Sequence, residues 1–353
     1  MNRRVLIDLD ALRDNYRVLQ ERAAPAECGA VVKSDAYGLG AIECSRALYA
    51  AGCRKFFVAT LEEAVPLRDE FADIELYALE GLEPERRAEF VAARIWPVLN
   101  SLEQVRAWAG AGDDAHCLVH IDSGMNRLGM TRAEVEALAA DRDLLGALTV
   151  DYVITHLGCS DEPAHEQNVR QLERFDELRA LLPPHKTSIA SSPGVFLASE
   201  HHGDLARPGI SLYGGRPDVG PGNPMREVAK VQGRIVQIRE VEDDAYVGYG
   251  ATEAVAAGSK LATIAFGYAD GYPRSLSSKG RVRIGDYVAK VIGRVSMDVT
   301  VVDISDAREG SISVGDWATL IGDGIDLDDV AEAAGTISYE LLNRIGRRVE
   351  RVY

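Results

Sequence analysis

The chain has 353 residues and a formal net charge of −16 at pH 7. Such an acidic chain repels phosphate backbones, so nucleic acid is excluded as an expected partner. The composition is 46% hydrophobic and 27% charged, which is typical of a globular protein with a sizeable core. The length favours one large domain and one smaller domain.

Cysteine usage and the distribution of apolar residues bear on location. The five cysteines are odd in number and form no C-x-x-C pair, a pattern typical of reduced thiols in a cytoplasmic protein. The first residues lack the apolar segment of a signal peptide, and no apolar run approaches membrane-spanning length. We therefore expect a cytoplasmic protein that does not associate with a membrane.

Short apolar runs alternate with helical patterns through the first two thirds of the chain, after a first helical segment at 10–19. Eight of these runs are predicted strands: Gly29–Lys33, Lys55–Thr60, Glu75–Leu79, Arg94–Leu99, His116–Ile121, Val150–His156, Thr187–Ser191 and Asp204–Arg207. Helices are predicted between them, among them Leu61–Phe71, Leu102–Ala109, Arg132–Ala140 and Glu162–Leu182. Eight strands separated by helices predict an α/β fold, a closed parallel (β/α)8 barrel of the TIM type.

The pattern changes at a proline- and glycine-rich stretch, residues 217–224, which is typical of a linker. Beyond it, alternating runs with β-branched residues predict strands at Val228–Val241, Leu261–Phe266, Arg281–Ile284, Tyr287–Ile292 and Val299–Ile304. One helix is predicted at Leu327–Ala334. We therefore expect a barrel domain at residues 1–222 and a mostly β domain at residues 223–353.

One lysine of the barrel region stands in an informative context. A short apolar run ends at Lys33, and small and polar residues, Tyr37 and two glycines follow it. Lys33 is thus expected at the carboxyl end of a strand, where α/β proteins place their chemistry. A lysine that reaches the surface from a strand end explains the same pattern, and this stretch alone does not decide between the two.

Other reactive or ligand-binding side chains follow further strands of the expected barrel. Because the strands' carboxyl ends share one mouth, we expect these residues to converge on Lys33: Arg127, His156, Ser192, Arg207, Gly209 and Ile210. Loops after strands seven and eight commonly bind phosphate, although ordinary turn chemistry explains a lone Ser192 or Gly209. A strand-end lysine facing a phosphate site suggests pyridoxal phosphate, whose aldehyde forms a Schiff base with an amine; a sugar-phosphate isomerase fits the same arrangement.

Short motifs follow one another in a fixed order over nearly the whole chain. They occupy residues 7–12, 30–40, 122–129, 154–157, 207–214, 267–272, 293–298 and 336–340. In order and spacing they resemble the motifs of the alanine racemases, which are fold-type III enzymes that depend on pyridoxal phosphate. Single motifs of this kind are weak signals, but their number, order and spacing together make the resemblance specific.

The resemblance implies how the cofactor, pyridoxal 5′-phosphate, is held. Lys33 would bind it covalently and also act as one acid/base. Arg207 would meet the pyridine nitrogen, and His156 would lie beside the ring and connect to Arg207. The cofactor phosphate would be bound by Tyr37, Ser192, Gly209, Ile210 and Tyr339.

The resemblance also implies a two-base racemisation of alanine, in which one group removes the α-proton and another delivers a proton to the opposite face. Tyr268 of a partner subunit would be the second acid/base beside Lys33, so a homodimer with shared active sites is expected. Arg127 and the backbone of Met297 would receive the substrate carboxylate, with Asp298 nearby. The product, D-alanine, would supply cell-wall peptidoglycan.

One position departs from the family pattern. The family often has a carbamylated lysine two residues before the Asp-x-Gly-Met stretch, and this chain has His120 there. Histidine does not form the same stable carbamate, so Arg127 lacks its usual anionic partner. We expect an inorganic anion such as chloride, or a nearby carboxylate, in its place; if His120 is neutral, direct hydrogen bonding to Arg127 is the alternative.

Several alternatives remain open from the sequence. The change at His120 weakens the inference that alanine rather than serine or another amino acid is the substrate. A fold-type III decarboxylase or metal-dependent dehydratase is disfavoured, because no His or Cys occurs from Arg226 to Tyr353, and no metal is expected. A barrel-only cofactor-carrying protein would lack the second domain. Tyr268 and Met297 could also be ordinary packing residues.

Overall fold

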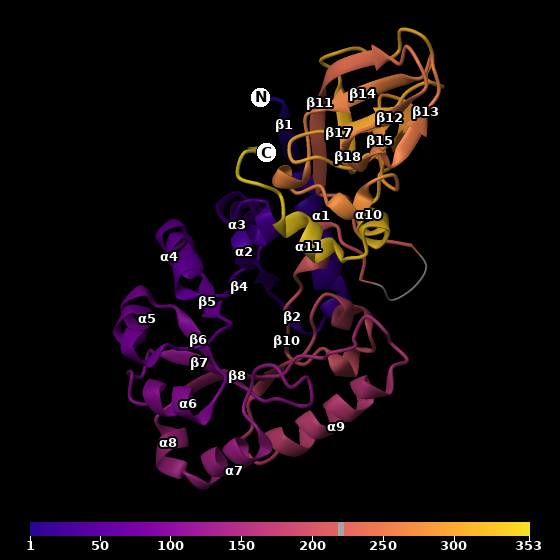
Figure 1. The fold of residues 1–353 in the computed structure, drawn as a ribbon. Coiled ribbons are helices and arrows are strands. Elements are labelled where there is room, and N and C mark those ends of the chain that lie inside the picture. Colours follow the sequence, from indigo (N-terminus) through magenta and orange to yellow (C-terminus); the bar gives the residue numbers. More distant parts are fainter. Residues whose placement is uncertain (218–221) are drawn as a thin grey trace.

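The computed structural model describes residues 1–217 and 222–353, and Figure 1 shows its two parts, an α/β part and a mostly β part. The middle of the predicted linker, residues 218–221, lies outside the described residues. The chain begins and ends in the β part, where its two termini lie near each other (Figure 1).

A curled, seven-stranded parallel sheet forms the centre of the α/β part. Its strands follow one another in chain order: β3 (Ala30–Val31), β4 (Lys55–Val58), β5 (Glu75–Ala78), β6 (Trp96–Leu99), β7 (His116–His120), β8 (Thr149–Ile154) and β9 (Lys186–Ser188). The sequence predicted all seven segments. Their buried, apolar residues explain why short runs without polar alternation form strands here, since a parallel sheet is covered on both faces.

The expected eighth strand is present but is not part of this sheet. β10 (Leu205–Ala206) pairs in parallel with β2 (Glu27–Cys28) as a separate two-stranded ladder. The first expected strand is interrupted at Gly29, between β2 and β3, so no continuous ladder joins β10 to the seven strands. Single backbone bonds do connect it, such as that from the N–H of Arg207 to the carbonyl of Ala190 beyond β9 (2.8 Å).

Helices connect the strands and cover the sheet. They are α1 (Leu9–Ala23), α3 (Ala41–Ala50), α4 (Leu61–Glu70), α5 (Arg87–Ala93), α6 (Leu102–Trp108), α7 (Arg132–Ala140), α8 (Arg142–Gly146) and α9 (Glu166–Arg179). Side-chain caps define several starts: Thr60 accepts from the N–H of Glu63, and Thr131 forms a capping box with Glu134. Thr60 comes two residues after the end of β4, whereas Thr131 follows a longer loop, residues 121–130, that contains Arg127.

The β part is built on an eight-stranded sheet in the order β14-β17-β16-β15-β18-β11-β1-β19, in which β11 also pairs with β14. The strands are β1 (Arg3–Ile7), β11 (Ala229–Glu240), β14 (Lys260–Ile264), β15 (Arg281–Ile284), β16 (Tyr287–Val291), β17 (Thr300–Asp303), β18 (Trp317–Ile321) and β19 (Glu350–Val352). A hairpin, β12 (Ala245–Val247) and β13 (Glu253–Val255), and the helices α10 (Leu327–Ala334) and α11 (Ser338–Asn343) complete it. The five strands and the helix α10 predicted here are confirmed.

The first strand belongs to the sheet of the β part. β1 runs antiparallel to β11, with Val5 opposite Val231, and parallel to β19. Val5 and Ile7 are buried, whereas the alternate side chains are more exposed, as expected for a strand with one covered face. This pairing was not predictable from local patterns, because the partners of β1 lie more than two hundred residues away.

Candidate active site

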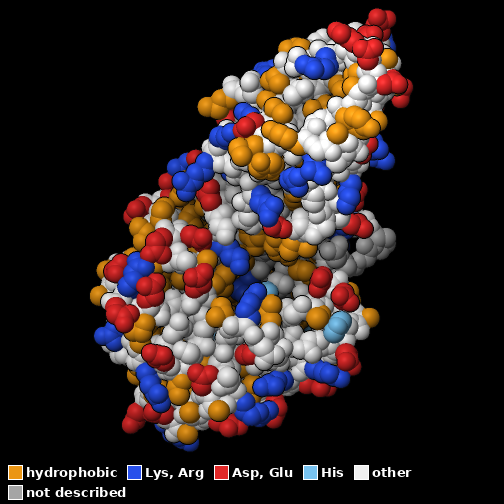
Figure 2. All heavy atoms as spheres, in the orientation of Figure 1, with side chains coloured by type: hydrophobic (Ala, Val, Ile, Leu, Met, Phe, Trp, Pro, Cys, Tyr) orange, Lys and Arg blue, Asp and Glu red, His pale blue; other side chains and the backbone are white. Residues whose placement is uncertain are grey.

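The carboxyl ends of the parallel strands surround a cavity of about 380 Å³. Figure 2 shows a hollow bordered by basic side chains where the α/β and β parts meet. Most residues singled out from the sequence line this cavity: Lys33, Tyr37, Arg127, His156, Ser192, Arg207, Gly209, Ile210 and Tyr339. The expected convergence on Lys33 is therefore present in the fold.

Lys33 begins an unusual turn, α2 (Lys33–Gly38). Four successive residues, Ser34 to Tyr37, have φ between 52° and 57°, which is the left-handed region. Such a conformation costs roughly 1–2 kcal/mol per non-glycine residue, so the surroundings must hold it. The N–H of Ser34 donates to Glu63 Oε1 (2.9 Å), and Asp35 Oδ1 accepts from the N–H of Ala41 (2.7 Å). The turn brings Tyr37 back to the same cavity as Lys33.

The surroundings of Lys33 favour its unprotonated amine. Burial lowers the pKa of Lys33, and the nearby charge of Arg127 lowers it further; the carboxylates of Glu63 and Glu80 oppose this only in part. An amine must be unprotonated to attack a carbonyl carbon. Lys33 therefore has the properties of a nucleophile or a base rather than of a surface charge.

Two short turns opposite Lys33 form a cradle for an anion. They are η2 (Pro193–Phe196) and η4 (Ile210–Tyr213), and the hydroxyl of Ser192 joins them by accepting from the N–H of Gly209 (2.8 Å). Within the described residues, the N–H groups of Ser192 and Ile210 donate to no protein acceptor. N–H groups at the starts of such turns that donate to no protein acceptor can bind the oxygens of a phosphate group.

A buried tyrosine lies against this cradle. The ring of Tyr37 packs on Tyr213 and Tyr339, with centroid distances of 4.8 and 5.9 Å. A Cβ at position 209 would lie 2.2 Å from the hydroxyl of Tyr37, so only Gly209 allows this hydroxyl to approach the turn. Burial raises the pKa of Tyr37, which keeps the hydroxyl protonated as a donor.

Arg207 places a buried cation at the cavity. It donates to the carbonyl of Thr155 (2.8 Å) and to the hydroxyl of Ser188, and no carboxylate in the described parts of the chain forms an ion pair with it. Burial lowers its pKa to about 10, so the guanidinium stays charged at neutral pH. An arginine without an acidic partner can donate to an electron-rich atom of a bound molecule.

Asn100, which no motif of the sequence marks, determines which ring nitrogen of His120 carries the proton. The amide nitrogen of Asn100 donates to the carbonyls of Leu79 and Val98, both at 3.0 Å, so Oδ1 faces Nδ1 of His120 at 2.7 Å. An amide oxygen only accepts, so Nδ1 carries the proton. Burial, with the charges of Arg207 and Arg127, lowers the pKa of His120 to about 3, and the ring is neutral at neutral pH.

This geometry decides among the partners expected for Arg127. Among the residues that the structure describes, no carboxylate forms an ion pair with Arg127, and His120 bonds to Asn100 instead. Neither a carboxylate nor His120 forms a bond with Arg127 among these residues, and the expectation of an inorganic anion stays a prediction. His156 also forms no hydrogen bond with Arg207; burial and the charge of Arg207 lower the pKa of His156 to about 3.

Tyr268, Met297 and Asp298 form a second group, outside the cavity that contains Lys33. Tyr268 begins η6 (Tyr268–Asp270) in the β part, and its side chain is 42% exposed; that of Met297 is 53% exposed. The carboxylate of Asp298 forms an ion pair with Arg348 (2.6 Å). One chain thus carries two separate groups of predicted site residues, one at the barrel mouth and one on the β part.

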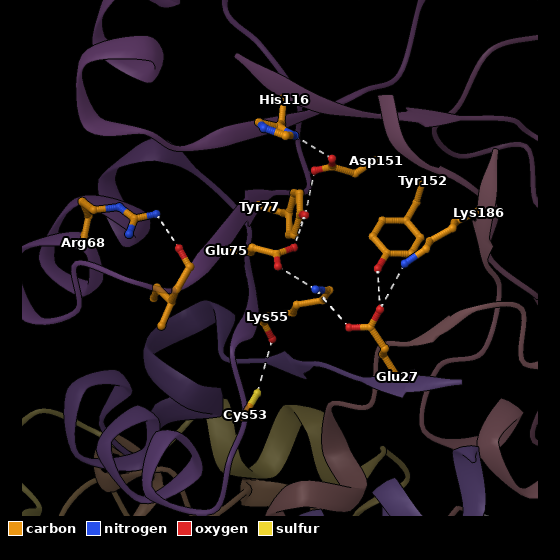
Figure 3. A network of polar contacts seen from close by, with 11 residues as sticks. Glu27, Cys53, Lys55, Arg68, Glu75, Tyr77, His116, Asp151, Tyr152 and Lys186 are labelled. Carbon is orange, nitrogen blue, oxygen red and sulfur yellow. Dashed lines mark hydrogen bonds and ion pairs between the residues drawn. The ribbon is translucent and has the colours of Figure 1, made fainter. Parts of the chain in front are cut away.

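A larger hollow, of about 1170 Å³, lies at the opposite, amino-terminal ends of the strands. Figure 3 shows several of its charged side chains in contact with one another, and Arg68 bonded to a backbone carbonyl. Lys55 lies 2.6 Å from Glu75 and 3.0 Å from Glu27, and His116 lies 2.7 Å from Asp151 on the neighbouring strand. Groups paired in this way tie adjacent strands together and are typical of a stabilising face.

The described residues contain neither a membrane-spanning helix nor a group of metal ligands. No helix there is both long and apolar enough to cross a bilayer. No three His, Cys, Asp or Glu side chains gather as metal ligands would. His116 and His120, which share β7, bond instead to Asp151 and Asn100.

Known proteins resemble this chain over its whole length. The family profile of the alanine racemase N-terminal domain matches residues 7–217, and that of the C-terminal domain matches residues 228–353. The alanine racemase of Rhodospirillum rubrum is 44% identical over 98% of this chain and 94% of that protein; a catabolic alanine racemase of Agrobacterium fabrum is 43% identical over 98% and 91%.

Solved structures agree with these matches. A Bartonella henselae alanine racemase with covalently bound pyridoxal phosphate superimposes with a TM-score of 0.95, at 36% identity, over 100% of this chain and 99% of that one. The biosynthetic alanine racemase of Pseudomonas aeruginosa gives a TM-score of 0.92, at 36% identity and the same coverage. Similarity at this level of identity and coverage, in both halves of the chain, shows that the protein belongs to the alanine racemase family.

Proposed function

We propose that this protein is an alanine racemase that uses pyridoxal 5′-phosphate and interconverts L- and D-alanine. The observation that carries the proposal is the cavity in which Lys33, with its lowered pKa, faces an anion cradle and the unpaired Arg207. The relatives named alanine racemase, and the neighbour with covalently bound pyridoxal phosphate, support it.

The residues at the barrel mouth fit the cofactor. Lys33 would hold it covalently, Arg207 would donate to the ring nitrogen, and His156 would lie beside the ring. The free N–H groups and the protonated tyrosine hydroxyl described above suit its phosphate, which Tyr37, Ser192, Gly209, Ile210 and Tyr339 would bind. The bound cofactor supplies the electron sink that makes the α-carbon of an amino acid acidic.

The two proton transfers need one group on each face of the substrate, and we assign them to Lys33 and Tyr268. The amine of Lys33 would accept or return a proton on one face, and the hydroxyl of Tyr268 would do so on the other. Arg127 would bind the substrate carboxylate together with the backbone of Met297 and with Asp298 nearby. The positive charge of Arg127, together with burial, also lowers the pKa of Lys33.

The separation of the two groups of site residues supports a homodimer. Tyr268 and Met297 are exposed on the β part and do not line the cavity of their own chain. A second copy would bring its Tyr268 to this cavity, so that each active site contains residues of both subunits. We further propose that the D-alanine produced supplies peptidoglycan synthesis.

We also propose that the α/β part is a complete eight-stranded barrel, in which β10 closes the curled sheet between β9 and the segment formed by β2 and β3. The N–H of Arg207 donates to Ala190 on one side (2.8 Å), and the N–H of Val31 donates to the carbonyl of Pro208 on the other (2.9 Å). The domains are assigned to residues 1–222 and 223–353, with β1 added to the second.

A racemisation assay with added pyridoxal phosphate tests the function. We expect turnover of both alanine enantiomers, slower turnover of serine, and a visible absorbance band of the bound cofactor that Arg207→Gln shifts in wavelength. Colourless protein that leaves alanine unchanged after cofactor addition would contradict the proposal, and would favour the sugar-phosphate isomerase alternative.

A further inference from the structure

Two loops of the β part carry the exposed residues Tyr268 and Met297, and their backbones are joined. The N–H of Tyr268 donates to the carbonyl of Ser296, and the N–H of Ala269 to that of Met297, both at 3.0 Å. A Cβ at Gly267 would lie 2.4 Å from the carbonyl oxygen of Ser296, so the loops approach as closely as glycine allows. The backbones at Tyr268 and Met297 therefore have fixed relative positions.

Two arginines from opposite ends of the chain bind both loops. Arg3, on β1, donates to Asp270 Oδ2 (2.9 Å) and to the backbone carbonyl of Asp298 (3.1 Å). Arg348, just before β19, donates to Asp270 Oδ1 (2.5 Å) and to the carboxylate of Asp298 (2.6 Å). Each arginine thus bridges the Tyr268 loop and the Met297 loop.

The shared carboxylate of this cluster is Asp270, whose side chain is fully buried. Its Oδ2 also accepts from the N–H of Gly267 (2.9 Å), so both oxygens are bonded. A buried carboxylate depends on its cationic partners, and removing one of them leaves charge that is poorly compensated. The loop conformation is therefore coupled to both arginines, although neither lines the cavity of Lys33.

We propose that Arg3, Arg348, Asp270 and Asp298 form a clamp that positions Tyr268 and Met297 for the active site of a second copy of this chain. Arg3 and Arg348 are positioning residues that act through the two loops and touch neither substrate nor cofactor. The proposal rests on the proposed function of Tyr268 as an acid/base. Proton transfer is sensitive to displacements of about 1 Å, which cost rates of up to about a hundredfold.

The test compares Arg348→Gln with Arg347→Gln in the full chain loaded with pyridoxal phosphate. Arg347 is the exposed neighbour, and no hydrogen bond or ion pair joins it to the described residues. Arg348→Lys keeps the charge but cannot bond both carboxylates with a planar fork. Arg3→Gln weakens the same clamp from β1 and serves as a second variant if Arg348→Gln folds poorly.

Two readouts are needed. The first is amide hydrogen exchange of the peptides that contain residues 267–272 and 296–299, which does not depend on turnover. The second is the primary deuterium isotope effect on racemisation, measured with α-deuterated L-alanine and D-alanine separately. A displaced Tyr268 slows proton transfer on its own face, so the isotope effect should increase for one enantiomer only.

We expect Arg348→Gln to speed exchange in both loops at least tenfold, to lower kcat about tenfold or more, and to raise the isotope effect for one enantiomer. Arg348→Lys should recover part of each change, and Arg347→Gln should match the unaltered protein. Unchanged exchange, or faster exchange without a one-sided isotope effect, would overturn the clamp. If the unaltered protein does not racemise alanine, the proposed function fails, and exchange alone then decides whether Arg348 holds the loops together.

Discussion

The two ends of the parallel sheet differ in how their charges are arranged. At the amino-terminal end, in the larger hollow, Lys55 and His116 each lie against a carboxylate of a neighbouring strand. At the carboxyl-terminal end, in the smaller cavity, Arg207 and Arg127 have no carboxylate partner among the described residues. Arg68, which lines the larger hollow, also has no carboxylate partner among the described residues, but its guanidinium donates to five backbone carbonyls. The buried amine of Lys33 and the unused N–H groups therefore identify the site, whereas the volume of a hollow does not.

The difference has a physical meaning. Paired charges satisfy one another and have little left to offer a ligand, and removing one partner leaves the other poorly compensated. Cations held by the backbone without an anion remain available. Burial and, after it, the charges of these cations lower the pKa values of Lys33, His120 and His156. The same sheet thus has one stabilising end and one reactive end.

The largest effect is expected when the reactive end loses its amine. Lys33→Ala should abolish both the absorbance band of the bound cofactor and racemisation in both directions, because no other lysine lines the cavity. Lys55→Ala is the matched variant at the stabilising end, and it should retain the band. Loss of the band in both variants, with both folded by circular dichroism, would remove the distinction between the two ends.

Stability should depend on pH through the reactive end. His120 and His156 have pKa values of about 3 in the folded protein, below the 6.5 of an unperturbed histidine. The unfolded chain therefore binds more protons between these values, and the free energy of unfolding should fall by up to about 1.4 kcal/mol per pH unit for each histidine as pH drops below 6.5.

Urea unfolding at a series of pH values measures how steeply the free energy of unfolding falls with pH. His120→Gln should remove about half of the part of this slope that is due to His120 and His156. The carboxylates of the protein contribute mainly below about pH 5, so the window from 6.5 to 5 is the informative one. A slope that is the same in His120→Gln and the unaltered protein would show that His120 is not held neutral by burial.

The smallest effect is expected at the stabilising end. The hydroxyl of Tyr77 lies 2.8 Å from Glu75 and 2.9 Å from Asp151, within the network of Figure 3. Tyr77→Phe removes this bond and should lower the free energy of unfolding by about 1–1.5 kcal/mol. Racemisation at 25 °C should be unchanged, and a marked fall in kcat would mean that the network also serves the active site.

Much of the fold follows from local patterns. The buried runs that became β4 to β9 are short, apolar and bounded by turns, so their type and order were predictable. The placement of Lys33 at a strand end followed from the same pattern. The separate ladder of β10 and β2, and the pairing of β1 with β11, depend on contacts between distant segments and were not visible in the sequence.

The site was predictable where residue type and strand position suffice, as for Ser192, Gly209 and Arg207 at the cavity. The site was not predictable where a side chain forms its hydrogen bond with a residue that is distant in the sequence. The bond from His120 goes to Asn100, twenty residues earlier, and two backbone carbonyls orient that amide. The left-handed turn after Lys33 was also hidden, since Ser34 to Tyr37 show no glycine to signal positive φ.

The central claim is that one active site draws Lys33 from one subunit and Tyr268 from another. The most direct measurement mixes two inactive variants, Lys33→Ala and Tyr268→Phe, with subunit exchange. In a mixed dimer one site contains both native residues, so an equal mixture should recover about a quarter of the activity of the unaltered protein. A mixture that stays inactive, although mixed dimers are detected by native mass spectrometry, would contradict the account.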